Sequence, residues 1–344
     1  MKKPILILKL GTAAITRADG TPDEPVMVDV ARQVAKLHQQ YHIAIVSSGA
    51  VGMGKQFIRG FSGKISERKA AAAIGNPILI NKYAQFFAPY GIHLALSLCE
   101  RQHFSQRSQF LQLRETFETL WAQDIIPVAN ENDVVSNLEL RFSDNDELAT
   151  LLAVGLGADK LLLGTSVPGL YDREGKVVPE IASFDEEVLG LANKTKSSSG
   201  LGGMISKLTF ARLASRMGIE VMIFGAREAD GIILAASGQT GTRCLAQASS
   251  LSARMKWIAS SSLVAGRVIV DAGARKALEN RNSLLAVGVE EIPFPFDKGE
   301  VFEVCVENQA PFALGRARLN SQALQDQAKA HDLILAHADE IVLL

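Results

Sequence analysis

Residues 124–165 read DIIPVANENDVVSNLELRFSDNDELATLLAVGLGADKLLLGT, and their pattern decides the fold class. The apolar runs at 124–130 and 159–165 have the length of buried strands, and the run at 146–158 has the length of a helix. A strand, a helix and a second strand in succession are typical of a parallel sheet with helices on its faces. The stretch between the first strand and the helix is rich in carboxylates and amides, which indicates a functional loop between two buried elements.

The same alternation continues on both sides of this stretch. Short apolar runs predict further strands, and residues with helical spacing predict helices between them. The predicted strands are 5–8, 42–50 (a strand and the turn after it), 92–99 and 219–225, and the predicted helices are 28–40, 69–91, 110–123 and 206–218. We therefore predict an α/β fold with a mainly parallel sheet that helices cover on both faces.

The pattern changes after about residue 247, where short strands and turns replace the alternation of strands and helices. We place a domain boundary near residues 246–254. The predicted domains are residues 1–250 and a small β-rich domain of residues 255–344.

Composition excludes several classes of protein. The 344 residues are 47% apolar with a net charge of −1, so the overall charge gives no case for binding nucleic acid or anionic lipid. Three widely spaced cysteines argue against a disulfide framework and against a zinc cluster. The N-terminal apolar run is interrupted by Lys9 and reads as a strand rather than a signal peptide, and no stretch has the length of a membrane span. We therefore expect a cytoplasmic protein.

Polar and glycine-bearing turns lie at the carboxyl ends of the predicted strands, where ligands bind in open parallel sheets. A further loop at 197–204 opens the helix that carries Lys207. The turns are Lys9-Leu10-Gly11-Thr12, Ser47-Ser48-Gly49-Ala50, Asn130-Glu131-Asn132-Asp133 and Thr165-Ser166. This combination indicates phosphoryl transfer, because glycine lets backbone N–H groups approach phosphate and lysines stabilise charge on the transferred group.

Each signal has a simpler alternative. Asn130 to Asp133 could form turns that cap a loop, and Asp144 could cap the helix at 146–158. Neither the P-loop motif nor the dinucleotide-binding G-x-G-x-x-G motif is present in the sequence. The prediction therefore depends on several signals at neighbouring strand ends.

The chain resembles the amino acid kinase family, and within it the enzymes that phosphorylate the side chain of glutamate. The blocks that carry the resemblance are KLGT (9–12), SSGAVGMG (47–54), PVANENDVV (127–135), SDNDELATLLA (143–153), GADKLLLGT (157–165) and GLGGMISK (200–207). The C-terminal part resembles a PUA domain, over stretches that include GRVIVDAGARKAL (266–278) and LGRARLNSQAL (314–324).

The resemblance implies a three-layer αβα kinase domain that transfers the ATP γ-phosphate to the side-chain carboxylate of L-glutamate. It implies catalytic roles for Lys9, Lys207 and Asp146, with Asp146 organising the two lysines, and it implies that Ser48, Asp133 and Asn145 contact glutamate. The residues at the nucleotide would be Lys9, Gly11, Thr165, Ser166, Leu201, Gly202, Gly203, Met204 and Lys207. Magnesium would bridge the phosphates, and no residue is assigned as a metal ligand.

The resemblance also implies feedback inhibition by proline and a homo-oligomer (dimer or tetramer). Contact with the next enzyme of proline biosynthesis is left open by the sequence, and the lability of glutamyl phosphate is the one argument for it. The sequence departs from the family pattern on the nucleotide side. Ser166 stands where the pattern has aspartate, Leu201 stands where it has a polar residue, and the loop at 172–175 is short. A raised Michaelis constant for ATP, or use of another nucleoside triphosphate, is the expected consequence.

Two other classes of function remain open from the sequence. The first is a kinase of the same fold that acts on another acceptor, such as acetylglutamate, aspartate, a carbamate or UMP. The second is an RNA-binding or regulatory protein with a relict kinase domain, since PUA domains elsewhere bind RNA. Retention of Lys9, Asp146 and Lys207 argues against the second class.

Overall fold

The computed structural model describes the chain except for residues 1–2, 18, 106, 136–141, 143, 193–202, 248–263, 308, 310, 327–332 and 344. The chain divides into two compact units, which are residues 1–100 with 112–249, and residues 101–111 with 250–344. The predicted boundary near 246–254 falls almost entirely on residues outside the described part, so its position stays a prediction.

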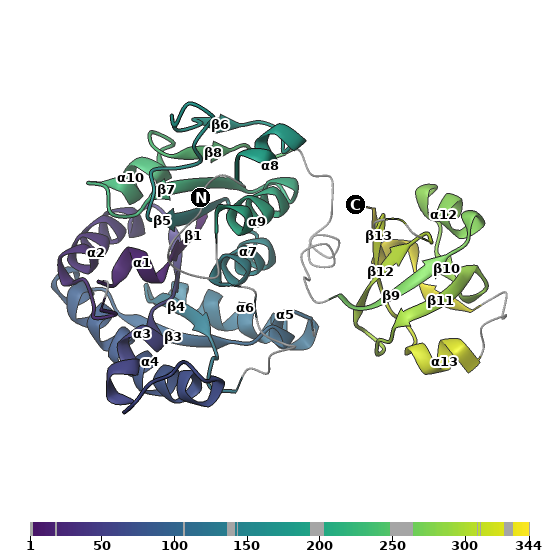
Figure 1. Cartoon of the computed structure of the whole chain (residues 1–344), viewed down its shortest axis with the longest axis horizontal. Helices are drawn as coiled ribbons and strands as arrows, with labels where there is room; N and C mark the ends of the chain where they lie inside the picture. The colour runs from purple at the N-terminus through teal and green to yellow at the C-terminus, as the bar shows by residue number, and fades with distance from the viewer. Residues whose placement is uncertain are drawn as a thin grey trace. The chain divides into compact units, whose positions relative to one another are not determined.

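An eight-stranded sheet forms the centre of the first unit (Figure 1). Its order is β3 (Leu94–Cys99), β4 (Ile126–Glu131), β2 (His42–Ser47), β1 (Ile5–Leu10), β5 (Lys160–Thr165), β7 (Glu220–Gly225), β8 (Thr242–Cys244) and β6 (Glu180–Ile181). Neighbouring strands are parallel except for the antiparallel pair β7 and β8. The mainly parallel sheet predicted from the sequence is therefore confirmed.

Helices cover both faces of this sheet, which gives three layers (Figure 1). One face carries α2 (Glu24–His38), α4 (Ile65–Phe87) and α10 (Gly231–Ala236), whose apolar side chains join those of β1, β2, β5 and β7 in one core. The other face carries α7 (Asn145–Leu156) and α9 (Met204–Arg216). Shorter or peripheral helices of this unit are α1 (Thr12–Ile15), α3 (Ala50–Gly54), η1 (Lys55–Phe57), η2 (Ala88–Tyr90), most of α6 (Arg107–Ala122) and α8 (Glu186–Ala192). Helix α5 (Gln102–Ser105) and the start of α6 fall in the segment 101–111 that is assigned to the second unit.

Two predicted boundaries were wrong in ways that matter for the site. The first strand extends to Leu10, so Lys9 lies within β1 rather than after it, because its backbone pairs with Val46 on one side and Leu163 on the other. Helix α4 begins at Ile65, before the predicted start at residue 69, because the Glu67 carboxylate accepts hydrogen bonds from the backbone N–H groups of residues 62–64.

The second unit has its own apolar core beneath a five-stranded sheet. The sheet order is β11 (Val289–Phe294), β9 (Val264–Val270), β12 (Val301–Cys305), β13 (Ala313–Arg316) and β15 (Ile341–Leu343), and β10 (Leu284–Leu285) pairs separately with β14 (Ile334–Ala336). Its helices are α12 (Ala272–Glu279), η4 (Ala286–Gly288), α13 (Ser321–Asp326) and η5 (Ala338–Glu340). The β-rich C-terminal region predicted from the sequence is confirmed.

Among the described helices of both units, none combines the length and the apolar character that crossing a bilayer requires.

Candidate active site

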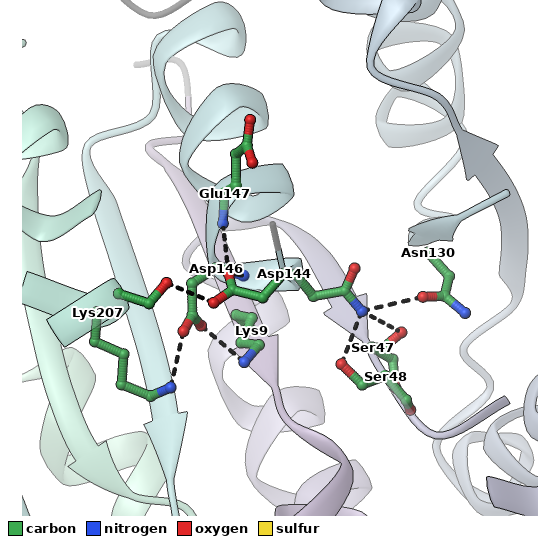
Figure 2. Close-up of polar contacts among 10 residues, drawn as sticks. Lys9, Ser47, Ser48, Asn130, Asp144, Asp146, Glu147 and Lys207 are labelled. Carbon is green, nitrogen blue, oxygen red and sulfur yellow. Dashed lines mark hydrogen bonds and ion pairs between the residues drawn. The ribbon is translucent and has the colours of Figure 1, made fainter. Parts of the chain in front are cut away.

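Two lysines and one aspartate form a buried charged cluster at the carboxyl edge of the sheet (Figure 2). Lys9 comes from β1, Asp146 from the first turn of α7, and Lys207 from the first turn of α9. Lys9 Nζ lies 2.7 Å from Asp146 Oδ1, and Lys207 Nζ donates a hydrogen bond of 2.8 Å to Asp146 Oδ2. The structure thus brings together the three residues predicted as catalytic, with a single carboxylate between two ammonium groups.

The three charged groups are buried, and their mutual attraction is stronger there than it would be in water. The Asp146 side chain has no exposed surface, and the two lysine side chains are each 7% exposed. Burial raises the pKa of the Asp146 carboxyl, but the ammonium groups of Lys9 and Lys207 outweigh that effect, and its pKa lies below the ordinary value. Asp146 is therefore an anion at neutral pH, and the three charges sum to one net positive charge at the sheet edge.

Asp144 connects the helices that carry Asp146 and Lys207. Its Oδ1 accepts hydrogen bonds from the backbone N–H groups of Asp146 and Glu147, at 2.8 and 3.1 Å, so it caps the N-terminus of α7 as the sequence allowed. Its Oδ2 accepts a hydrogen bond from the Ser206 hydroxyl on α9. One carboxylate thus holds the first turns of α7 and α9 together beside the charged cluster.

A group of amides and hydroxyls lies on the other side of Asp144 (Figure 2). Asn145 Nδ2 donates to Ser48 Oγ at 2.7 Å and to Asn130 Oδ1 at 3.1 Å, and it lies 3.4 Å from the Ser47 carbonyl oxygen. Ser48 and Asn145, both predicted to contact the acceptor, are therefore in direct contact. Asp133 lies two residues past the end of β4 and is half-buried.

Two turns at this edge of the sheet, after β1 and after β2, contain a glycine at a position where a side chain would be unfavourable. Gly49 has φ of +111°, a conformation that favours glycine, and it precedes α3 directly after Ser48. Gly11 follows β1, and a Cβ at this position would lie 3.4 Å from Lys9 Nζ. A side chain at Gly11 would therefore cover the ammonium group that the site presents.

The predicted nucleotide side is described only in part. Thr165 ends β5, Ser166 is exposed in the bend that follows, and Gly203 directly precedes α9, whose first residue is the buried Met204. Leu201 and Gly202 lie outside the described residues.

Sequence reasoning missed two residues that contact this group. Asn76 on α4 accepts a hydrogen bond of 3.0 Å from Asn130 Nδ2, and Ser206 donates to Asp144. A polar residue inside the apolar run AAAAIGNPILI (70–80) is the one sequence signal that could have indicated Asn76, and Ser206 carries no comparable signal.

The cluster suits a substrate that brings several negative charges. Backbone turns, two lysines and a carboxylate that orients them are what charge stabilisation in phosphoryl transfer requires. Among the described residues, no group of three or more histidines, cysteines, aspartates or glutamates is placed to hold a metal ion.

Comparison with known proteins agrees with this chemistry. Residues 4–225 match the amino acid kinase family, and residues 266–337 match the PUA domain. The glutamate 5-kinase of Proteus mirabilis (strain HI4320) is 37% identical over 337 residues, which cover 95% of this chain and 92% of that protein. The glutamate 5-kinase of Haemophilus influenzae (strain 86-028NP) is 34% identical over 337 residues, which cover 94% of this chain and 91% of that protein.

Solved structures share the fold at lower identity. Carbamate kinase from Giardia lamblia bound to AMP-PNP superposes with a TM-score of 0.52 at 18% identity, covering 71% of this chain and 99% of that chain. UMP kinase from Ureaplasma parvum superposes with a TM-score of 0.50 at 14% identity, covering 71% of this chain and 97% of that chain. At these identities the similarity shows the fold alone.

Proposed function

The chain belongs to the amino acid kinase family, and glutamate 5-kinases are among its curated relatives. We propose the following roles for its site residues. The reaction is transfer of the γ-phosphate of ATP to the γ-carboxylate of L-glutamate, which gives L-glutamyl 5-phosphate and ADP in the first step of proline biosynthesis. The observation that carries the division of roles is the cluster of Lys9, Asp146 and Lys207.

Lys9 and Lys207 stabilise the negative charge that spreads over the phosphoryl oxygens during transfer. Asp146 holds both ammonium groups at the sheet edge, within 2.8 Å of its oxygens. Its lowered pKa makes it a poor base, and the reaction needs none, because a glutamate carboxyl with a pKa of about 4.3 is already ionised at neutral pH. Asp146 is therefore an orienting residue rather than a proton acceptor.

The remaining residues divide between acceptor and nucleotide. Ser48, Asn145 and Asp133 bind glutamate, a role supported by the contact between Ser48 and Asn145. Gly11, Thr165, Ser166, Leu201, Gly202, Gly203 and Met204 surround the nucleotide together with the two lysines. Magnesium would be held by the phosphates and water rather than by a cage of side chains, and it would neutralise phosphate charge.

Family membership supports further proposals. These are feedback inhibition by proline, assembly as a dimer or tetramer, and transfer of the labile acyl phosphate to the next enzyme of the pathway. We place the activity in the cytoplasm, because all three cysteines are free thiols, as a reducing compartment favours.

The experiment that tests the function is ADP release from MgATP with L-glutamate, compared with acetylglutamate, aspartate and UMP, in the presence and absence of proline. Hydroxylamine traps the acyl phosphate as a hydroxamate. Turnover with glutamate and suppression by proline are the expected results. Turnover with another acceptor and none with glutamate would contradict the proposed acceptor.

Substitution of Lys207 by alanine separates the enzyme from a relict kinase domain. The expected result is loss of phosphoryl transfer by a chain that still folds, because Lys207 supplies charge to the transferred group. A folded wild-type chain without turnover on any of these acceptors would favour the RNA-binding alternative, which binding assays with RNA would then test.

A further inference from the structure

The amide of Asn145 is oriented by its neighbours. Its Nδ2 group donates to Ser48 Oγ at 2.7 Å and to Asn130 Oδ1 at 3.1 Å, and the Ser47 carbonyl oxygen is a third acceptor at 3.4 Å, so acceptors surround both of its hydrogens. The hydrogen bonds that the Asn145 side chain makes with described residues all use Nδ2 and none uses Oδ1. Asn145 is therefore left with an oxygen that can accept a hydrogen bond from a ligand.

A backbone hydrogen bond determines which atom of the Asn130 side-chain amide is the oxygen and which is the nitrogen. Asn130 Oδ1 accepts a hydrogen bond of 2.9 Å from the backbone N–H of Glu131, and a backbone N–H can only donate. The atom facing Asn145 is thus an oxygen, and the Asn130 Nδ2 group points the other way. That group donates to Asn76 Oδ1 at 3.0 Å.

Asn76 supports this chain of amides from inside helix α4. It is 3% exposed, and its oxygen is the acceptor that Asn130 requires. Its Nδ2 group is buried and has no hydrogen-bond partner among the described residues, although an unpaired buried donor is costly. A polar residue kept at such a position indicates a role other than stabilising the core.

The backbone of α4 is held firmly at this point. A Cβ at Gly75 would lie 1.7 Å from the carbonyl oxygen of Ala50, so α3 and α4 contact each other through their backbones beside Asn76. Helix α3 begins at Ala50, two residues after Ser48. The helix that carries Asn76 therefore also supports the turn that carries Ser48.

We propose that Asn76 is a positioning residue of the acceptor site, which holds the Asn130 side chain in place together with the Glu131 backbone N–H and so orients the amide of Asn145. The site then presents Asn145 Oδ1 to the ammonium group of an amino acid acceptor. This inference rests on the proposed function, since it assigns atoms to the binding of glutamate.

The test compares Asn76→Leu with Asn76→Asp, which keeps an oxygen for Asn130 Nδ2. Asn76→Ala is the second disrupting variant in case the leucine variant does not fold. Asn81→Leu on the exposed side of the same helix is the matched control. The ligands are L-glutamate and glutarate, which has the same two carboxylates but no ammonium group, together with MgATP.

Loss of one orienting hydrogen bond should raise the KM for glutamate about tenfold in Asn76→Leu and Asn76→Ala, with the KM for ATP unchanged. The inhibition constant of glutarate should change much less, because glutarate cannot use Asn145 Oδ1. Asn76→Asp should restore most of the affinity for glutamate, and Asn81→Leu should behave as the wild type.

Equal changes for glutamate and glutarate, or a parallel rise in the KM for ATP, would overturn the proposal, because they would indicate a general structural defect. An unchanged KM for glutamate in a folded Asn76→Ala chain would overturn it as well. Failure of the proposed function is distinguishable, because the wild-type chain itself would then not turn over glutamate.

Discussion

At the scale of single residues, the charge balance of Asp146 controls the site. One buried carboxylate holds two buried ammonium groups, so its removal leaves two positive charges without a counter-ion. Breaking a buried ion pair costs more than its formation contributes, since the remaining charge stays desolvated.

Asp146→Asn should reduce kcat at least about a hundredfold, because the lysines lose the group that aims them at the phosphates. It should also lower the free energy of unfolding by about 3–5 kcal/mol. Steady-state kinetics and urea unfolding measure the two effects. A variant with full stability and reduced kcat would show that the lysines find other partners in the folded chain.

Comparison of the wild type with Asp146→Asn also gives a prediction for the pH dependence of stability. The pKa of Asp146 is lower in the folded chain than its ordinary value of 3.8, so its contribution to stability is complete above that value and is lost as pH falls through the folded pKa. The difference in unfolding free energy between wild type and Asp146→Asn should be constant from about pH 6 to 8 and should shrink only below about pH 4. A difference that varied between neutral and weakly alkaline pH would contradict the assignment.

Ser166 offers a prediction on the nucleotide side. It is exposed directly after β5, and the family resemblance implies an aspartate at this position. Ser166→Asp should lower the KM for ATP and sharpen the preference for ATP over other nucleoside triphosphates, with the KM for glutamate unchanged. A survey that found tight, ATP-only use by the wild type would remove the reason for this expectation.

At the scale of elements, the site depends on the side-chain contacts that connect the N-terminal turns of α7 and α9. Asp144 caps α7 with one oxygen and accepts a hydrogen bond from Ser206 of α9 with the other. Asp146 and Lys207 form a second connection between the same two helices.

Ser206→Ala should lower kcat several-fold and the free energy of unfolding by about 1 kcal/mol, because Asp144 loses a partly buried hydrogen bond and α9 loses its alignment with α7. Ser206→Thr keeps the hydroxyl and is the control, with activity near that of the wild type. Equal loss in both variants would indicate that packing, and not the hydroxyl, is what matters.

Helix α4 provides a test of close packing. Gly75→Ala should destabilise the chain by several kcal/mol, since its Cβ would lie 1.7 Å from the Ala50 carbonyl oxygen and the two helices would have to separate. Gly190→Ala on α8, where a Cβ would meet nothing within 4 Å, is the matched control and should be neutral or slightly stabilising. Thermal unfolding of both variants decides the point.

At the scale of the whole molecule, the described site residues all belong to the first unit, while the second unit has a separate core. A chain that ends at residue 247 should therefore keep glutamate-dependent ADP release, with unchanged KM values for both substrates. Loss of turnover by a folded truncated chain would show that residues 248–344 contribute to the active state.

Much of this could be predicted from local patterns. Apolar runs of strand length alternating with helical spacing predicted the parallel sheet, because each element in such a fold carries its own pattern of burial. Strand ends and glycine turns predicted the edge of the sheet where Ser48 and Asn130 lie, since parallel strands end at a common edge, whereas the role of Asn145 was implied by the family resemblance. The cap at Asp144 was one of two readings that the sequence left open.

The sequence by itself determined the fold class, the family and the edge of the sheet at which the polar residues gather. The tertiary structure gave the geometry of Asp146 between Lys9 and Lys207, and it alone decided that Asn76 supports Asn130 from a helix on the opposite face. The physical reason is that local patterns encode burial, whereas hydrogen bonds and ion pairs between distant residues depend on strand order and on how closely helices approach. Helices α3 and α4 can approach closely because Gly75 has no side chain, and a single glycine does not reveal such a contact in the sequence.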